Sequence, residues 1–185
     1  LDGLRVLVTA GGTREPIDSV RYVGNRSSGR MGFAVADEAT ARGADVTVIA
    51  ANVGLPRTAG IAYQDVETAA ELEEAARRLF PQADVLVMAA AVADFRPGEA
   101  AAGKISKAGR EGLDLRLEPT TDVLAALSEG RRPGQTLIGF AAEHGEGAVE
   151  RARAKLERKR LDAVVVNDIA RGDIGFDAPD NEVTV

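Results

Sequence analysis

The stretch from Ala10 to Gly32, AGGTREPIDSVRYVGNRSSGRMG, constrains the fold more than any other part of the chain. It follows the apolar run Arg5–Ala10 and leads into a helical pattern over Ser28–Arg42, so a buried strand passes through glycines into a helix. Phosphate commonly binds at such a crossing, because unpaired backbone N–H groups and the helix dipole both favour an anion. The alternative is a βα loop whose glycines serve only for tight turning.

This crossing matches neither of the two common nucleotide motifs. The dinucleotide fingerprint keeps its glycines within one short turn and places an acidic residue about 20 residues further on, at the end of the second strand. Here the second expected strand, Asp45–Ala50, leads to Ala51 and Asn52. No G-K-[ST] follows the glycines, which excludes a P-loop. The sequence therefore predicts a site for a nucleotide or a phosphorylated ligand whose class these motifs do not name.

The amino-acid composition limits which side chains can carry out catalysis. With no Cys and a single His144, thiol nucleophiles, histidine triads and multi-histidine metal sites are excluded. Catalysis must then use Lys, Arg, Asn, carboxylates and backbone N–H groups, with a hard cation such as Mg²⁺ as an option. A net charge of −6 argues against unspecific nucleic-acid binding. The longest apolar run, Val85–Ala93, is far shorter than the roughly 20 residues that cross a bilayer, and no signal peptide is visible, so we expect a cytoplasmic protein.

Strand-like apolar runs alternate with helical patterns along the chain. We expect strands at Arg5–Ala10, Asp45–Ala50, Ile61–Val66, Asp84–Ala90, Leu113–Leu117, Thr136–Ala141, Leu161–Asn167 and Phe176–Val185, and helices at Ser28–Arg42, Ala69–Phe80, Asp122–Leu127 and Gly147–Arg160. Ser28, Thr68 and either Thr121 or Asp122 are the expected N-caps. This pattern predicts one α/β domain over residues 1–185, with a doubly wound, mostly parallel, Rossmann-like sheet. The carboxyl ends of the strands then share one edge.

Three further segments each have two interpretations, and the first of them lies at that edge. Ala89–Asp94 has side chains small enough to leave its backbone open to a flat ring, but it also fits a buried strand that ends at a polar residue. Residues 98–112, GEAAAGKISKAGREG, form either a mobile lid that carries lysines or a solvated linker. Lys155 and Lys159 lie four residues apart on one helix face, which from spacing alone is more often solvated than functional.

Taken in order, these segments resemble the phosphopantothenoylcysteine synthetase family, which joins phosphopantothenate to cysteine in coenzyme A biosynthesis. The matching motifs are GGTREPIDSVRYVGNRSSGRMG at 11–32, AAAVADFRP at 89–97, Lys104-Ile-Ser-Lys107, GFAAE at 139–143, and NDI at 167–169 with a later Phe176 and Asn181. In bacteria this domain is commonly fused behind a flavin-dependent decarboxylase. We therefore expect the chain to be a domain of a longer protein, with FMN bound only by the other domain.

The resemblance implies a ligation in two steps that depends on CTP and Mg²⁺. The carboxylate of phosphopantothenate attacks the α-phosphate of CTP, which gives an acyl-CMP and pyrophosphate. The amine of cysteine then displaces CMP. The resemblance also implies a homodimer in which the lid closes over the neighbouring site. Two alternatives are a nicotinamide-dependent reductase, which would need a ribose-binding acid at Ala51 or Asn52, and a non-catalytic regulatory subunit of the same family.

Position by position, the resemblance assigns catalytic roles to Asn25, to Arg21 one helical turn before it, and to the lid lysine Lys104. It assigns nucleotide binding to Gly12, Ser28, Gly29, Ala89, Ala90, Ala91, Asp94, Phe140, Lys155 and Lys159. It assigns no metal ligands. The chain departs from the family pattern twice: Ser106 interrupts a lid that often reads Lys-Ile-Lys-Lys, and Thr121 stands where a proline commonly precedes the aspartate.

Overall fold

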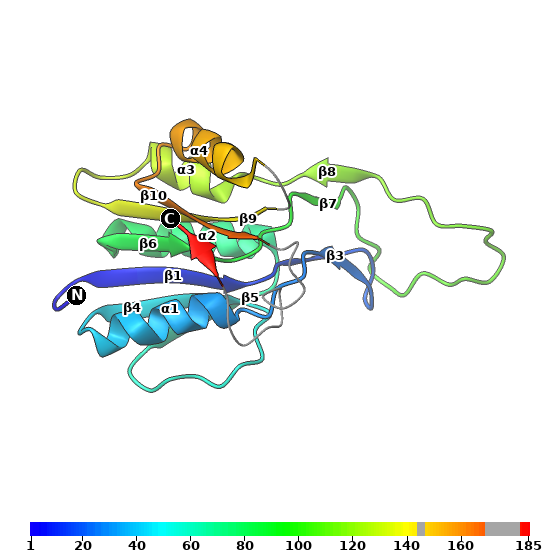
Figure 1. Cartoon of the computed structure of the whole chain (residues 1–185). Coiled ribbons are helices and arrows are strands. Elements are labelled where there is room, and N and C mark those ends of the chain that lie inside the picture. The colour runs from blue at the N-terminus through cyan, green and yellow to red at the C-terminus, as the bar shows by residue number, and fades with distance from the viewer. Residues whose placement is uncertain (144–146, 169–181) are drawn as a thin grey trace.

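The structure, a computed structural model, describes residues 1–143, 147–168 and 182–185. Its centre is a seven-stranded sheet with helices on both faces (Figure 1). The strands are β1 (Arg5–Gly11), β4 (Asp45–Ala51), β5 (Ala62–Val66), β6 (Val85–Met88), β9 (Thr136–Glu143), β10 (Ala163–Asp168) and β11 (Val183–Thr184). All neighbouring strands are parallel except β11, which is antiparallel to β10. The predicted mostly parallel α/β sheet is confirmed.

The order of the strands locates the functional edge. Across the sheet they run β11-β10-β9-β6-β1-β4-β5, so the six parallel strands, numbered along the chain, follow the Rossmann order 3-2-1-4-5-6. The direction of winding reverses between β1 and β6, where Thr9 lies opposite Met88. A crevice forms at such a switch point, beyond the carboxyl ends of the strands. The glycines of the crossing follow one of these two strands, and Ala89–Asp94 follows the other.

Two layers of apolar side chains hold the helices on the sheet. The helices are α1 (Arg30–Ala41), α2 (Ala69–Leu79), α3 (Val123–Glu129) and α4 (Ala148–Arg158), with a short 3₁₀ helix at Phe80–Gln82. Phe33 and Ala36 of α1 pack with Val48 of β4 on one face. Leu72 of α2 and Leu124 of α3 belong to the cluster on the other face, which α4 also covers. Within the part of the chain that the structure describes, no helix has the length and apolar character to cross a membrane.

Two of the predicted helix caps are confirmed and one is wrong. Thr68 Oγ1 accepts a hydrogen bond from Glu71 N at 3.2 Å in a full capping box at α2, and Asp122 caps α3. Ser28 does not cap α1, because the helix begins at Arg30 and its N-cap is Gly29, with φ 79° and no side-chain cap. A Cβ on Gly29 would lie 2.7 Å from the side chain of Val53. Close packing at the sheet edge therefore requires glycine at the cap.

Two small hairpins stand beside the carboxyl edge of the sheet, and the sequence did not predict them. One joins β2 (Arg14–Pro16) to β3 (Tyr22–Gly24), and the other joins β7 (Phe95–Pro97) to β8 (Leu117–Pro119). Residues 98–116, between β7 and β8, have no regular structure and project as a long loop (Figure 1). We call this segment the lid loop.

The predicted strand Leu113–Leu117 is wrong. Its leucines alternate with charged residues, but pairing with β7 begins only at Leu117, opposite Pro97. β7 ends at Pro97, so residues 113–115 have no ladder partner among the residues that the structure describes, and a strand is not formed without one. The other predicted edge strand, Phe176–Val185, lies mostly outside the described residues, which include only β11 at its end.

Candidate active site

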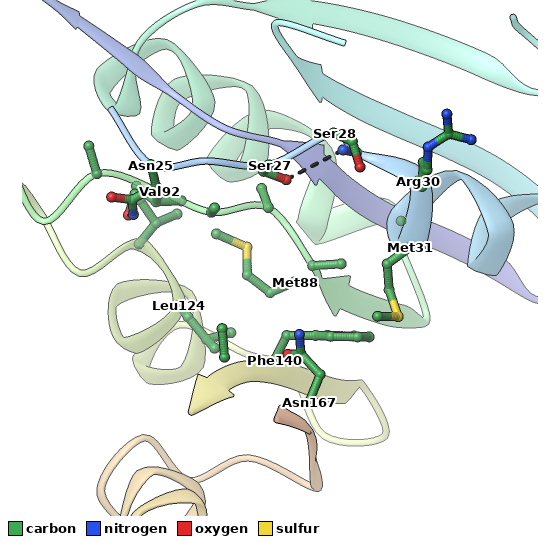
Figure 2. A pocket seen from close by; sticks show the side chains of 18 of the residues that line it. Asn25, Ser27, Ser28, Arg30, Met31, Met88, Val92, Leu124, Phe140 and Asn167 are labelled. Carbon is green, nitrogen blue, oxygen red and sulfur yellow. Dashed lines mark hydrogen bonds between the residues drawn. The ribbon is translucent and has the colours of Figure 1, made fainter. Parts of the chain in front are cut away.

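A cleft of about 820 Å³ opens at the switch point, beyond the ends of β1, β6 and β9 (Figure 2). Segments from across the sequence meet in its wall: the β3–α1 loop, the residues after β6, the start of α3, and the facing side of α4. The predicted site residues that line it are Asn25, Ser28, Gly29, Ala89, Ala90, Ala91, Asp94, Phe140, Lys155 and Lys159. Three candidates, Gly12, Arg21 and Lys104, are not among the lining residues.

Gly12 supports the cleft from below. Its N–H donates to Ala51 O at 3.1 Å, and it forms an isolated parallel bridge with Ala91. A Cβ at this position would lie 2.7 Å from the backbone oxygen of Asn25. A side chain at position 12 would thus push Asn25 away from the cleft. The requirement for glycine here comes from close backbone packing beneath the site.

Asn25 is fixed onto the segment that follows β6. Its Nδ2 donates to Val92 O at 3.1 Å. An amide group has two N–H donors and one carbonyl acceptor. The second N–H and the oxygen Oδ1 are therefore available to a ligand in the cleft that Asn25 lines.

Two buried threonines hold the backbone of the segment after β6, and the sequence analysis did not identify them. Thr9 Oγ1 accepts from Ala90 N at 3.1 Å, and Thr13 Oγ1 accepts from Ala93 N at 2.9 Å. Both threonines are fully buried. A third threonine, Thr120, donates from Oγ1 to Ala93 O at 2.6 Å. The signal for Thr9 was a hydroxyl within an otherwise apolar, buried strand.

The two candidate lysines, Lys155 of α4 and Lys159 directly after it, line the same cleft, and each has a protein partner in this structure. Lys155 Nζ donates to Phe140 O at 2.6 Å, and Lys159 Nζ lies 2.7 Å from an oxygen of Asp122. Burial opposes ionisation of Asp122, but hydrogen bonds from Lys159 and Ala125 N outweigh it and hold the pKa of this carboxyl below its usual range. A phosphate that bound here would compete with these partners for the lysines.

Several lining residues were missed by the sequence analysis. They are Ser27, Arg30, Met31, Thr120, Thr121, Asp122 and Asn167. Figure 2 shows Met31, Met88 and Asn167 near Phe140, whereas Arg30 points away from the centre of the pocket. Asn167 could have been found, because it stands near the end of a buried parallel strand at the shared edge.

Neither Arg21 nor Lys104 lines the cleft, and Arg21 contacts the lid loop at the residue after Lys104. Arg21 Nη1 pairs with Asp18 at 2.9 Å, and its Nη2 donates to Ile105 O at 3.3 Å. Lys104 is exposed, beside Ile105. The expectation of one helical turn between Arg21 and Asn25 is wrong, because the extended strand β3 lies between them. The catalytic roles of Arg21 and Lys104 remain predictions.

The end of β4 does not provide the acid that a nicotinamide-dependent reductase needs there. Asn52 follows β4 with φ 54°, and its Nδ2 donates to Gly12 O and Glu67 O, both at 2.9 Å. The side chain thereby joins the glycine crossing to the loop after β5. These hydrogen bonds stabilise the backbone beneath the site, and Asn52 provides no acidic group for a ribose.

Carboxylates are present in the cleft, but no dedicated metal cage is found in the described ranges. These residues contain no group of three or more His, Cys, Asp or Glu that could hold a metal ion. Asp94 and Asp122 both line the cleft. Mg²⁺ in nucleotide enzymes is usually bound by one or two carboxylates together with substrate phosphates, so these two residues fit that role.

The chain was compared with known families, proteins and structures. The family described as DNA/pantothenate metabolism flavoprotein C-terminal domain matches residues 1–185. The coenzyme A biosynthesis bifunctional protein CoaBC of Mycolicibacterium smegmatis is 49% identical over 176 residues, which cover 90% of this chain and 42% of that protein. The chain thus spans less than half the length of this relative.

Two solved structures are similar over most of the chain. The crystal structure of the C-terminal domain of CoaBC is 34% identical with a TM-score of 0.79, and the match covers 100% of this chain and 86% of that one. A Cab2 variant in complex with phosphopantothenate-cysteine is 18% identical with a TM-score of 0.76, covering 90% and 73%. The second likeness concerns the fold alone.

Proposed function

The chain belongs to the DNA/pantothenate metabolism flavoprotein C-terminal domain family, and we propose that it joins 4′-phosphopantothenate to L-cysteine, with CTP, in coenzyme A biosynthesis. Its relationship to CoaBC proteins supports this proposal. The observation that carries it is the cleft at the switch point, which is lined by Asn25, the start of α1 and the lysines Lys155 and Lys159. These are groups for binding phosphates and positioning two nucleophiles, and the proposed reaction needs no protein nucleophile.

In the first proposed step, the carboxylate of phosphopantothenate attacks the α-phosphate of CTP and pyrophosphate leaves. The start of α1 has no side-chain cap at Gly29, so its N–H groups are open to phosphate oxygens. Lys155 and Lys159 provide positive charge from the opposite wall. Asp94 and Asp122 would hold Mg²⁺, which would supply further charge neutralisation on the phosphates.

In the second proposed step, the amine of cysteine attacks the acyl carbon and CMP leaves. The acyl-CMP must stay oriented, and water must be kept away, until the amine arrives. Asn25 suits this task because a neutral amide can hold an acyl phosphate without adding charge. Its attachment to Val92 O fixes its position beside the segment after β6.

We expect the enzyme to prefer CTP over ATP. The backbone of Ala89–Ala91 lies at the end of β6, with Thr9 holding Ala90 from below. A small pyrimidine can be recognised by the N–H and C=O groups of such a fixed segment, whereas a purine needs more room. Turnover at limiting concentrations of each nucleotide measures the preference. Comparable rates with CTP and ATP would exclude this form of base recognition.

One experiment tests the proposed function as a whole. The chain is incubated with phosphopantothenate, cysteine, Mg²⁺ and one nucleotide at a time, and pyrophosphate is measured. Pyrophosphate release that requires phosphopantothenate supports the proposal. The absence of release with every nucleotide would end it.

We also propose a homodimer. The two hairpins and the lid loop expose six large apolar side chains: Val20, Tyr22, Phe95, Leu113, Leu115 and Leu117. Val20 is 63% exposed, and Tyr22 and Phe95 are each 51% exposed. Exposed apolar groups gathered in one region commonly mark a protein interface. The lid loop projects away from the sheet (Figure 1), which suits a role at a neighbouring subunit.

Light scattering at micromolar concentration should therefore give the mass of a dimer, and Phe95→Glu should give a monomer. Val149→Glu is a matched control, because Val149 is an exposed apolar residue of α4, at 40%, outside the hairpins. A wild-type monomer, or a Phe95→Glu variant that stays dimeric, would contradict this interface. We also propose a flavin-dependent decarboxylase as a partner domain, which the word "bifunctional" in the name of the CoaBC relative supports. A cytoplasmic location is part of the same proposal.

A further inference from the structure

Asp18, in the turn between β2 and β3, is a buried carboxylate to which the proposed reaction gives no role. The residue is 4% exposed, and its side chain is fully buried. Oδ1 accepts from Val20 N and Arg21 N, both at 2.8 Å. Oδ2 accepts from Arg21 Nη1 at 2.9 Å and from Ile105 N at 3.1 Å. A buried carboxylate is tolerated when its oxygens are satisfied in this way.

The two oxygens of Asp18 have different tasks. Oδ1 closes the local turn, as aspartate side chains often do. Oδ2 reaches outside the turn, to a residue 87 positions away along the chain. A purely local role would need only Oδ1. The bond from Ile105 N to Oδ2 therefore requires a second explanation.

The partner of Oδ2 is the point at which the lid loop is attached to the hairpin. Ile105 N donates to Asp18, and Ile105 O accepts from Arg21 Nη2, so both backbone groups of Ile105 are bound by the same turn. A second bond, from Ala101 N to Ile17 O at 3.0 Å, lies nearby. The lid loop is otherwise irregular and mostly exposed. Ile105 is thus its main polar attachment to the hairpin.

Lys104 is the residue before this attachment. With the backbone fixed at Ile105, the range of positions open to Lys104 is set by the hairpin and not by the length of the lid loop. The same carboxylate also orients the guanidinium of Arg21. One buried group therefore controls two of the candidate catalytic side chains.

We propose that Asp18 is a positioning residue, whose Oδ2 anchors the lid loop at Ile105 and thereby sets the places of Lys104 and Arg21 for the reaction. The catalytic part of this inference rests on the proposed function. The anchor itself does not, and it can be measured without any substrate.

Asp18→Asn separates the two oxygens. The asparagine oxygen can still accept from Val20 N and Arg21 N and so preserve the turn. The amide NH₂ group then faces Ile105 N and Arg21 Nη1. All of these groups are donors, so neither of the bonds that Oδ2 accepted can form. Ile105→Pro removes the same bond from the other side, because proline has no N–H, and leaves the hairpin turn unchanged. The second variant keeps the test valid if Asp18→Asn fails to fold.

Asp84→Asn is the matched control. Asp84 also binds a backbone N–H and an arginine side chain, at Arg5. Hydrogen bonds from Arg5 lower the pKa of Asp84 to about 2, so this carboxylate is also a bound anion. It stands just before β6, at the opposite edge of the sheet from the lid loop. A general effect of losing an Asp–Arg pair would appear in this variant too.

Limited trypsin cleavage after Lys107, located by mass spectrometry, reports the anchor in every variant, whereas the bond after Lys104 is unsuitable because trypsin does not cleave the Lys–Pro bond that Ile105→Pro introduces there. Loss of one charge-assisted hydrogen bond should increase the open population, and with it the cleavage rate, on the order of 10-fold in Asp18→Asn and Ile105→Pro. Asp84→Asn should be cleaved there at the wild-type rate. Pyrophosphate release should show kcat lowered on the order of 10-fold, with the KM for CTP within about 3-fold of wild type, since the cleft is untouched.

Unchanged cleavage in both anchor variants would overturn the proposal. So would faster cleavage with unchanged kcat, because the anchor would then not position catalytic groups. If the wild-type chain releases no pyrophosphate with any nucleotide, the proposed function fails. The cleavage rates then decide separately whether Asp18 anchors the lid loop.

Discussion

In a single turnover, with enzyme in excess over CTP, replacing Asn25 by alanine should leave pyrophosphate release within a few-fold of wild type, while ligation of cysteine falls on the order of 100-fold. The amide lies beside the segment after β6, held by Val92 O, and its remaining donor faces the cleft. Formation of the acyl-CMP depends mainly on charge neutralisation by the lysines and the start of α1. The second step depends on how long the acyl phosphate keeps its orientation, which is the task we assign to Asn25.

Two assays on the same sample separate the steps. Pyrophosphate release measures activation, and the appearance of CMP with phosphopantothenoylcysteine measures ligation. Asn25→Asp provides the contrast: it has the same size but places a negative charge near the phosphates, and it replaces the donor to Val92 O with a second acceptor. Both steps should therefore fall in that variant. Equal losses of the two steps in Asn25→Ala would contradict the role of Asn25 in the second step.

The main features of the fold could be predicted from sequence because they follow from burial. Strands such as β1, which is buried from Val6 onward, are continuous apolar runs in the sequence. The helices between them have apolar residues at helical spacing. The hairpins could not be predicted in this way. β2, β3, β7 and β8 have three residues each, too few for any periodicity to be recognised. In the lid loop, the alternating leucines indicated a strand for which the described residues provide no partner.

The cleft was predicted better than the contacts that support it. Residues that face the cleft stand in local motifs at strand ends, where the sequence marks them by glycine, alanine or lysine. The supporting contacts join residues distant in sequence, such as Thr13 with Ala93 and Asp18 with Ile105, which are 80 and 87 positions apart. No local pattern identifies such pairs. The same limit explains why Asp122 was predicted as a helix cap but not as the partner of Lys159.

Replacing Lys104 by glutamine should lower activation by roughly 10²–10³-fold and leave CTP binding nearly unchanged. Lys104 is exposed on the lid loop and does not line the cleft. Ground-state CTP therefore gains little from it. When the α-phosphate is attacked, negative charge grows on its oxygens and on the departing pyrophosphate. When the lid closes, Lys104 comes close to this negative charge in a site from which water is excluded. A charged hydrogen bond is strong in such a site.

Lys107→Gln distinguishes a specific lysine from the general charge of the lid loop. Lys107 is also exposed and lies three positions further on, beyond Ser106, where the loop is less basic than in the usual lid. Only Lys104 is adjacent to Ile105, the residue that Asp18 and Arg21 bind from both sides. The rate loss should therefore be large in Lys104→Gln and small in Lys107→Gln, with both variants binding CTP by calorimetry as the wild type does. If Lys104→Gln turns over near the wild-type rate, or is inactive because CTP no longer binds, transition-state stabilisation by the lid is wrong.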